Sequence, residues 1–195
     1  MVLGRICVYC GANRGSDPVY ADAARAMGRA LAERGIGLVT GGGRVGLMGV
    51  VADAALEAGG FVTGVIPEAL TTKELAHRGL TDLVVTASMH ERKAKMAELS
   101  DGFVALPGGL GTYEELFEIW TWAQLGWHGK PCGVLNAAGF YDRLVAFLDG
   151  STEAGFLKPQ HRAMLVVESD PERLIDRFEV YTAPAVTKWI GQDQT

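Results

Sequence analysis

The chain has 195 residues and a mass of 20.8 kDa, the size of one typical domain. Hydrophobic residues make up 48% and mean hydropathy is +0.13, which excludes a disordered chain. Lys and Arg number 18 against 23 Asp and Glu, and the net charge of −5 argues against nucleic-acid or anionic-membrane binding. No apolar run suits a membrane span and no signal-peptide pattern is visible. We therefore expect one cytoplasmic domain over residues 1–180, with a C-terminal tail at 181–195.

Short apolar runs alternate along the chain with longer segments of helical pattern. The runs predict strands at Ile6–Tyr9, Gly37–Thr40, Phe61–Ile66, Leu83–Thr86, Gly102–Leu106, Cys132–Leu135 and Leu165–Val167. Helices are predicted at Ala21–Arg34, Met89–Leu99, Glu115–Gln124, Tyr141–Glu153 and Asp170–Phe178. Asp17 before Pro18 marks the start of the first helix, and Ser88 with Glu91 forms a capping box for the second.

This alternation predicts an α/β fold. The strands are near-continuously apolar, which is typical of parallel strands covered on both faces. We expect a Rossmann-like, doubly wound parallel sheet with helices on both faces, in three layers. Ligands of such sheets bind beyond the carboxyl ends of the strands, so the loops there are the place to look for chemistry.

The cysteines predict neither redox nor metal chemistry. Cys7 and Cys10 form a CxxC, but Cys7 lies inside an apolar run and not at a helix start, as a thioredoxin-type motif requires. A zinc site would need two more ligands at similar spacing, and only Cys132 remains. We expect buried free thiols in a reducing compartment and no bound metal.

The first of two glycine-rich loops covers Thr40–Gly49, between a predicted strand and a helix. Gly41, Gly43 and Gly46 satisfy the GxGxxG spacing of dinucleotide sites, which alone is weak evidence. The motif follows the second strand, and its acidic ribose ligand would have to be Glu68, so dinucleotide binding fits poorly. Two interpretations stay open: a tight turn that packs helix against strand, or N–H groups that contact a phosphate.

The second glycine loop, residues 106–115, is more specific. It also joins a strand to a helix, and Gly108, Gly109 and Gly111 allow its N–H groups to converge on one point. The helix N-terminus adds partial positive charge, so the loop suits an anion. The lysine of an ATP-hydrolysing P-loop is missing.

Polar side chains of the following helix fall within an arc of roughly 120°; they are Glu114, Glu115, Glu118 and Thr121. A solvated helix face would explain them, but Trp120 and Trp122 point to nearly opposite sides, so more than one face must be buried. A partner subunit would account for this. We favour a polar stripe that faces a cleft.

Arg92 is the candidate cation. It lies in the first turn of its predicted helix, where the dipole disfavours positive charge, and it shares a stripe with Met89, Met96 and Leu99 that should face the core. A snorkelling arginine paired with an acid is one interpretation. The preferred one is a guanidinium aimed at a phosphate or sugar oxygen beside the glycine loops.

Together these residues resemble the Lonely Guy (LOG) family of cytokinin riboside 5′-monophosphate phosphoribohydrolases. Residues 107–115 match the family signature PGGxGTxxE, Met89–Lys93 matches MHxRK, and Gly41–Gly49 matches GGGxxGLMG. The similarity extends from about Arg5 to Phe178, and two long motifs in register are far stronger evidence than a lone GxGxxG.

The resemblance implies hydrolysis of the N-glycosidic bond of an N6-modified AMP, or of AMP itself, to free base and ribose 5-phosphate. It makes Glu115 and Arg92 catalytic, with Glu115 ionised beside a helix N-terminus to stabilise an oxocarbenium-like sugar, attack it or position water. Glu74 matches an acidic family residue, although Thr71 and Glu74 also read as a capping box. With the glycine loops expected to hold the 5′-phosphate, the predicted substrate-binding residues are Gly42, Gly43, Glu74, Lys93, Gly108, Gly109, Leu110, Gly111, Thr112, Tyr113, Glu114 and Thr121.

Relatives are homodimers or larger, so the resemblance also implies a homodimer that acts on a small nucleotide; the charge balance had already argued against nucleic-acid and membrane partners. Many relatives carry an older lysine decarboxylase label, but the sequence indicates no pyridoxal phosphate site, and no cofactor is expected. Two alternatives stay open. One is a carrier without turnover, similar to the molybdenum cofactor carriers; the other is a deoxyribosyltransferase-like enzyme in which Glu115 is a covalent nucleophile and the sugar passes to a second base.

Overall fold

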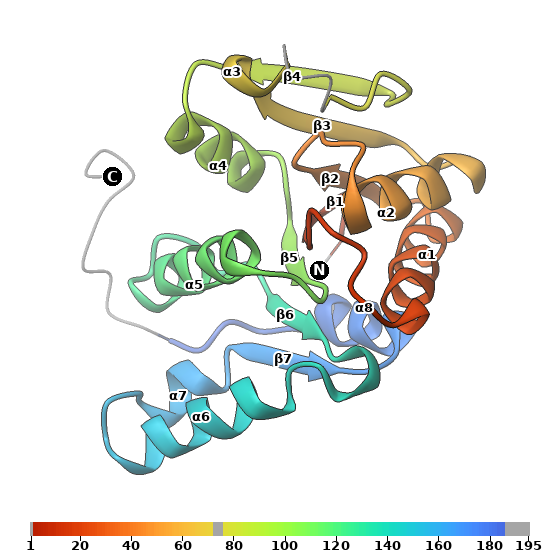
Figure 1. The fold of residues 1–195 in the computed structure, drawn as a ribbon. Helices are drawn as coiled ribbons and strands as arrows, with labels where there is room; N and C mark the ends of the chain where they lie inside the picture. The colour runs from red at the N-terminus through yellow and green to blue at the C-terminus, as the bar shows by residue number, and fades with distance from the viewer. Residues whose placement is uncertain (1, 72–75, 186–195) are drawn as a thin grey trace.

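The computed structural model describes residues 2–71 and 76–185 (Figure 1). All seven predicted strands form one parallel sheet in the order β4-β3-β2-β1-β5-β6-β7. The strands are β1 (Arg5–Tyr9), β2 (Gly37–Thr40), β3 (Val62–Pro67), β4 (Asp82–Thr86), β5 (Gly102–Ala105), β6 (Cys132–Leu135) and β7 (Leu165–Glu168). The doubly wound α/β prediction is therefore confirmed.

The longer predicted helices are also present, and their start signals work as expected. The helices are α1 (Pro18–Glu33), α2 (Gly46–Glu57), α3 (Glu68–Thr71), α4 (Met89–Glu98), α5 (Leu110–Gln124), the 3-10 turn η1 (Ala137–Gly139), α6 (Asp142–Glu153), α7 (Pro159–Arg162) and α8 (Pro171–Glu179). The Asp17 carboxylate accepts a hydrogen bond from the N–H of Val19 at the start of α1. The Ser88 hydroxyl accepts one from the N–H of Glu91 at the start of α4. None of the helices in the described ranges is long and apolar enough to cross a membrane.

The predicted start of α5 at Glu115 is wrong. The helix begins at Leu110 and Gly109 is its N-cap, so part of the glycine-rich segment forms the first turn. Leu116 packs into the core and Thr112 is buried in these early turns, and this burial outweighs the low helix propensity of glycine. The short elements α3, α7 and η1 were not predicted because three or four residues show no helical period.

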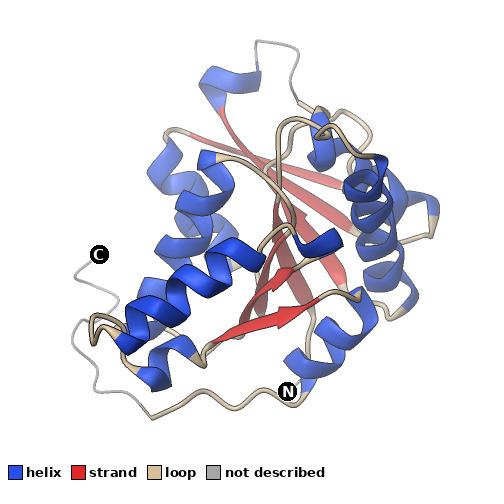
Figure 2. Ribbon diagram, turned by 60° about the horizontal axis from the view of Figure 1, so that its bottom comes forward, coloured by secondary structure: helices blue, strands red, loops and turns tan. Residues whose placement is uncertain are grey.

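The helices form two layers around the sheet (Figures 1 and 2). Successive residues of β1 alternate between them: Ile6 and Val8 pack against α1, α2 and α8, whereas Cys7 and Tyr9 pack against α4, α5 and α6. The prediction that strands are covered on both faces holds for the central strands only. At the edge, Asp82 and Val85 of β4 are exposed.

The topology places a crevice at the centre of the sheet. After β1 the chain builds β2, β3 and β4 outward on one side, then returns to place β5 on the other side of β1. The loops after β1 and β5 consequently lead to helices in opposite layers, α1 and α5. Ligands of open α/β sheets bind at such a switch point.

Candidate active site

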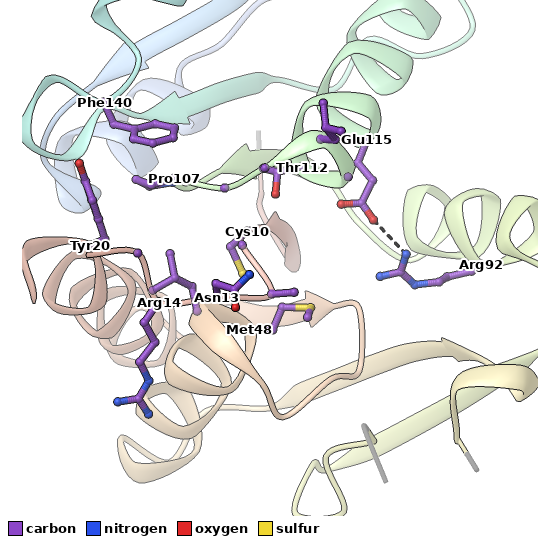
Figure 3. Close-up of a pocket in the computed structure, with 18 residues that line it drawn as sticks. Cys10, Asn13, Arg14, Tyr20, Met48, Arg92, Pro107, Thr112, Glu115 and Phe140 are labelled. Atoms are coloured by element: carbon purple, nitrogen blue, oxygen red, sulfur yellow. Dashed lines mark hydrogen bonds and ion pairs between the residues drawn. The ribbon is translucent and has the colours of Figure 1, made fainter. Parts of the chain in front are cut away.

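A pocket of about 510 Å³ opens at this switch point, beyond the carboxyl ends of β1 and β5 (Figure 3). The loops after these two strands form most of its wall and are joined by a hydrogen bond from the N–H of Gly11 to the carbonyl of Pro107, at 3.1 Å. The lining residues are Cys10, Gly11, Ala12, Asn13, Arg14, Gly15, Tyr20, Leu47, Met48, Arg92, Pro107, Gly108, Gly109, Leu110, Gly111, Thr112, Glu115 and Phe140.

The N-terminus of α5 forms one wall of this pocket. Its cap is a glycine without a side-chain hydrogen bond, and the first N–H groups of a helix have no partner within that helix. Thr112 is 3% exposed and lines the pocket, and its hydroxyl has no hydrogen bond among the described residues. A Cβ on Gly108 would collide with that hydroxyl, so the close approach of loop and helix requires glycine there. This wall presents unpaired donors and partial positive charge, which suits an anion.

Arg92 and Glu115 meet beside this wall. Nη1 of Arg92 donates to Oε1 of Glu115 at 3.0 Å, from α4 to α5, and the two side chains are only 10% and 12% exposed. Nε of Arg92 donates to the carbonyl of Val65 at the end of β3, at 3.0 Å. The prediction that Arg92 faces the core is confirmed, whereas Met89, from the same predicted stripe, is 46% exposed.

The pKa of Glu115 is raised above its ordinary value. Burial is the largest cause, and the positive charge and hydrogen bond of Arg92 oppose it. α5 begins earlier than predicted, and Glu115 lies in its second turn, where the helix N-terminus contributes less to stabilising the charged form. A carboxylate with a raised pKa in a pocket is typical of groups that handle protons or developing charge.

The predicted stripe of α5 is divided between two environments. Glu115 faces the pocket, whereas Glu114 and Glu118 accept hydrogen bonds from Nζ of Lys93, at 2.5 and 2.9 Å. Burial lowers the pKa of Lys93, but the two carboxylates outweigh burial and raise it overall. Thr121 is exposed. Two cross-helix ion-pair groups thus join α4 to α5, and Arg92–Glu115 is the group that reaches the pocket.

The sequence pattern of Trp120 and Trp122 predicted that a partner subunit covers one face of α5. The structure explains both side chains without a partner. Trp120 is buried and its indole N–H donates to the carbonyl of His161 at 3.0 Å. Trp122 lies 4.2 Å from Trp127 between ring centroids, in an edge-to-face contact. The chain itself therefore covers much of both rings. Residues near His161 cover Trp120, and Trp127, just after α5, covers Trp122.

The structure brings together only part of the predicted substrate-binding set. Residues 108–112 line the pocket, together with the predicted catalytic residues Arg92 and Glu115. Lys93, Tyr113, Glu114, Thr121, Gly42 and Gly43 lie outside its lining. Glu74 falls outside the described residues. The substrate contacts of all these residues stay predictions.

The pocket also contains residues that sequence reasoning missed. Tyr20 from α1 and Phe140 from the loop after β6 meet edge-on, with ring centroids 5.6 Å apart, at the end opposite Arg92 (Figure 3). Ala138, at φ 50, is the non-glycine residue with positive φ in the turn that presents Phe140. Tyr20 follows β1 and Phe140 follows β6. These positions indicate pocket residues only when the strand order is known, and the sequence does not give that order.

The described residues contain no group of three or more His, Cys, Asp or Glu that could hold a metal ion. The three cysteines are free and buried, and burial raises the pKa of each thiol. Cys10 lines the pocket as a neutral thiol, and its charged form is disfavoured by burial first and by Glu115 second.

A family model described as possible lysine decarboxylase matches residues 48–178. LOGL1 of Oryza sativa subsp. japonica, named a probable cytokinin riboside 5′-monophosphate phosphoribohydrolase, is 49% identical over 92% of this chain and 80% of its own length. LOG5 of Arabidopsis thaliana, named a cytokinin riboside 5′-monophosphate phosphoribohydrolase, is 46% identical over 91% of this chain and 78% of its own length.

The fold is also similar to that of a molybdenum cofactor binding protein from Rippkaea orientalis. The TM-score is 0.69 and the match covers 92% of this chain and 97% of that chain. At 23% sequence identity, this similarity concerns the fold.

Proposed function

The chain belongs to the LOG family of cytokinin riboside 5′-monophosphate phosphoribohydrolases, and we propose that it hydrolyses the N-glycosidic bond of an N6-modified adenosine 5′-monophosphate. Water adds to the anomeric carbon, and the base leaves with the electron pair of the broken bond and gains a proton. The products are the free base and ribose 5-phosphate. The observation that carries this proposal is the buried Arg92–Glu115 pair in the same pocket as the unpaired donors of α5.

The 5′-phosphate binds at the start of α5. A dianion there accepts hydrogen bonds from the N–H groups of the first turn and from the hydroxyl of Thr112. Helix rise places the backbone of Glu115 about 7.5 Å further along the axis than that of Leu110. This spacing is comparable to that between the phosphorus and the anomeric carbon of a nucleotide, so a phosphate bound at Leu110 brings the sugar to Glu115.

Glu115 acts on the sugar. Cleavage of an N-glycosidic bond gives the anomeric carbon oxocarbenium character, as in O-glycoside hydrolysis. The Glu115 carboxylate stabilises this positive charge and orients the attacking water. The buried position strengthens both interactions because the local dielectric is low.

Arg92 keeps this carboxylate available. Its hydrogen bond fixes one oxygen of Glu115 and its charge favours the ionised form, against the effect of burial. The second carboxylate oxygen has no hydrogen bond from the described residues and can bind water or sugar. Arg92 thereby acts as both an orienting and a charge-balancing group.

Product analysis tests the proposal. Purified protein is incubated with AMP and with isopentenyladenosine monophosphate, and the mixture is separated by chromatography. Free base together with ribose 5-phosphate supports hydrolysis. Intact nucleotide that stays bound to folded protein would contradict it and favour a carrier, and transfer of the sugar to an added second base would favour the transferase alternative.

We also propose that the protein acts as a cytoplasmic homodimer. Free, buried thiols suit a reducing compartment. Val85 and Met89 expose apolar side chains near the start of α4, at 53% and 46%, and a second copy would cover them. Sedimentation equilibrium at micromolar concentration distinguishes a mass of about twice 20.8 kDa from that of the single chain.

A further inference from the structure

The first glycine loop has a feature that phosphate contact does not explain. Leu47 and Met48, which follow it, line the pocket, but Gly42 and Gly43 are buried outside the lining. Gly42 has φ +72, a conformation that a turn requires and that favours glycine. Gly41 has no such conformation, since it is not among the glycines with positive φ. Backbone geometry alone would therefore permit alanine at position 41.

Space explains the glycine at position 41. A Cβ built there would collide with Nη2 of Arg92 and would lie 3.3 Å from Cζ of the same guanidinium. It would also lie 3.4 Å from Sδ of Met48, which is ordinary contact. The severe conflict is thus with the Arg92 guanidinium alone, which packs directly on the Gly41 backbone at the carboxyl end of β2.

Three different elements hold the Arg92 guanidinium. The end of β2 provides the flat surface at Gly41, the carbonyl of Val65 in β3 accepts from Nε, and Glu115 in α5 accepts from Nη1. Arg92 is 8% exposed, so it has little room to adopt another rotamer. Removal of any one of these supports should change the direction in which Nη1 points.

We propose that Gly41 is a positioning residue: its missing side chain forms the seat that, together with the Val65 carbonyl, aims the Arg92 guanidinium at Glu115. Gly41 thus acts on the reaction through Arg92. The effect on catalysis rests on the proposed function, whereas the placement of Arg92 does not.

The first test uses Gly41→Ala without substrate. In the wild-type protein, the Nε–H of a buried arginine bonded to a carbonyl gives a resolved NMR signal, assigned by its loss in Arg92→Lys. Gly41→Ala should shift or broaden this signal. Gly133→Ala is the control: a Cβ at that buried β6 glycine would also be crowded, at 3.0 Å from Leu174, Phe178 and the carbonyl of Val166, and Arg92 is not among its nearest contacts. An unchanged Arg92 signal in Gly41→Ala would overturn the proposal.

The second test measures coupling. Gly41→Ala should lower the melting temperature of the wild-type protein but have a clearly smaller effect in the Arg92→Lys variant, which lacks Nη2. Equal losses in both backgrounds would show that position 41 acts independently of Arg92 and would overturn the proposal. Both tests remain valid if the wild-type protein releases no base, so a failure of the proposed function is recognised separately.

Activity provides the third readout. Gly41→Ala should lower kcat about 10- to 100-fold with KM changed less than about threefold, because a misplaced catalytic group affects the chemical step more than substrate binding. Gly133→Ala should retain kcat per folded molecule. A fall in activity caused only by a higher KM would contradict the assigned role.

Discussion

Nη1 of Arg92 donates to Oε1 of Glu115 at 3.0 Å, although the residues lie on different helices and 23 positions apart. Each charge would be costly to bury alone, and removal of one partner of such a pair typically costs about 3–5 kcal/mol. The pair nevertheless lies in the pocket where α5 presents its unpaired donors. Burying two charges in this pocket costs free energy, and we infer that the pair is there for function more than for stability.

The pH dependence of the reaction should report this pair. Burial raises the pKa of Glu115 above its ordinary 4.5, and Arg92 opposes that shift. Because the ionised form is the active one, kcat/KM should rise with pH through an apparent pKa above 4.5. Arg92→Gln removes the opposing charge and should move this limb to higher pH. A limb that stays in place in the variant would contradict the coupling.

Thr112 should distinguish nucleotides from nucleosides. Thr112→Val keeps the shape but removes a hydroxyl from the proposed phosphate site, so KM for the nucleotide should rise about tenfold, the equivalent of one hydrogen bond to a charged group. Any cleavage of the corresponding nucleoside should change little, and Thr112→Ser should restore most of the affinity. Equal losses for nucleotide and nucleoside would place the hydroxyl away from the phosphate.

The fold could be predicted from the sequence to a large extent. Strands such as Gly37–Thr40 and Cys132–Leu135 are short apolar runs that local pattern identifies directly, and both appear with the predicted bounds. The exposure of β4 could not be predicted, because its apolar residues resemble those of a buried strand. Which strand lies at an edge is decided by strand order, which local pattern does not encode.

Site residues that belong to a sequence motif could be predicted. Properties that depend on the three-dimensional arrangement, such as burial or contacts between distant segments, could not. Arg92 and Glu115 follow from the signatures, and the structure places them in contact. The raised pKa of Glu115 depends chiefly on burial, which a motif does not contain. Phe140 enters the pocket from β6, far along the chain, and only the tertiary fold could identify it.

Tyr141 should stabilise the loop that carries the second glycine motif. Its hydroxyl donates to the carbonyl of Leu106 at 2.6 Å, and the side chain is 1% exposed. Tyr141→Phe leaves that carbonyl without its partner in a buried position and should lower the free energy of unfolding by about 1–3 kcal/mol. Urea denaturation measures this difference. Tyr20→Phe, at a partly buried ring without a hydrogen bond from its hydroxyl among the described residues, is the comparison and should be nearly neutral.

The thiols should be unreactive in the folded protein. Burial raises the pKa of Cys7, Cys10 and Cys132, so the reactive thiolate is scarce at pH 8. A disulfide reagent should react slowly with native protein and rapidly with three thiols after denaturation. One fast thiol in the native state would show that solvent reaches Cys10 through the pocket.

The most direct test of the account is base release by Glu115→Gln. This variant retains the shape of the side chain but removes the carboxylate, so base release should fall at least about 10³-fold, within the range for loss of a key charged group. Nucleotide binding, measured by calorimetry, should persist because the phosphate site at α5 is intact. Glu98→Gln, on the exposed side of α4, is the control and should release base at the wild-type rate. If Glu115→Gln released base as fast as wild type, the buried pair would not be the catalytic centre.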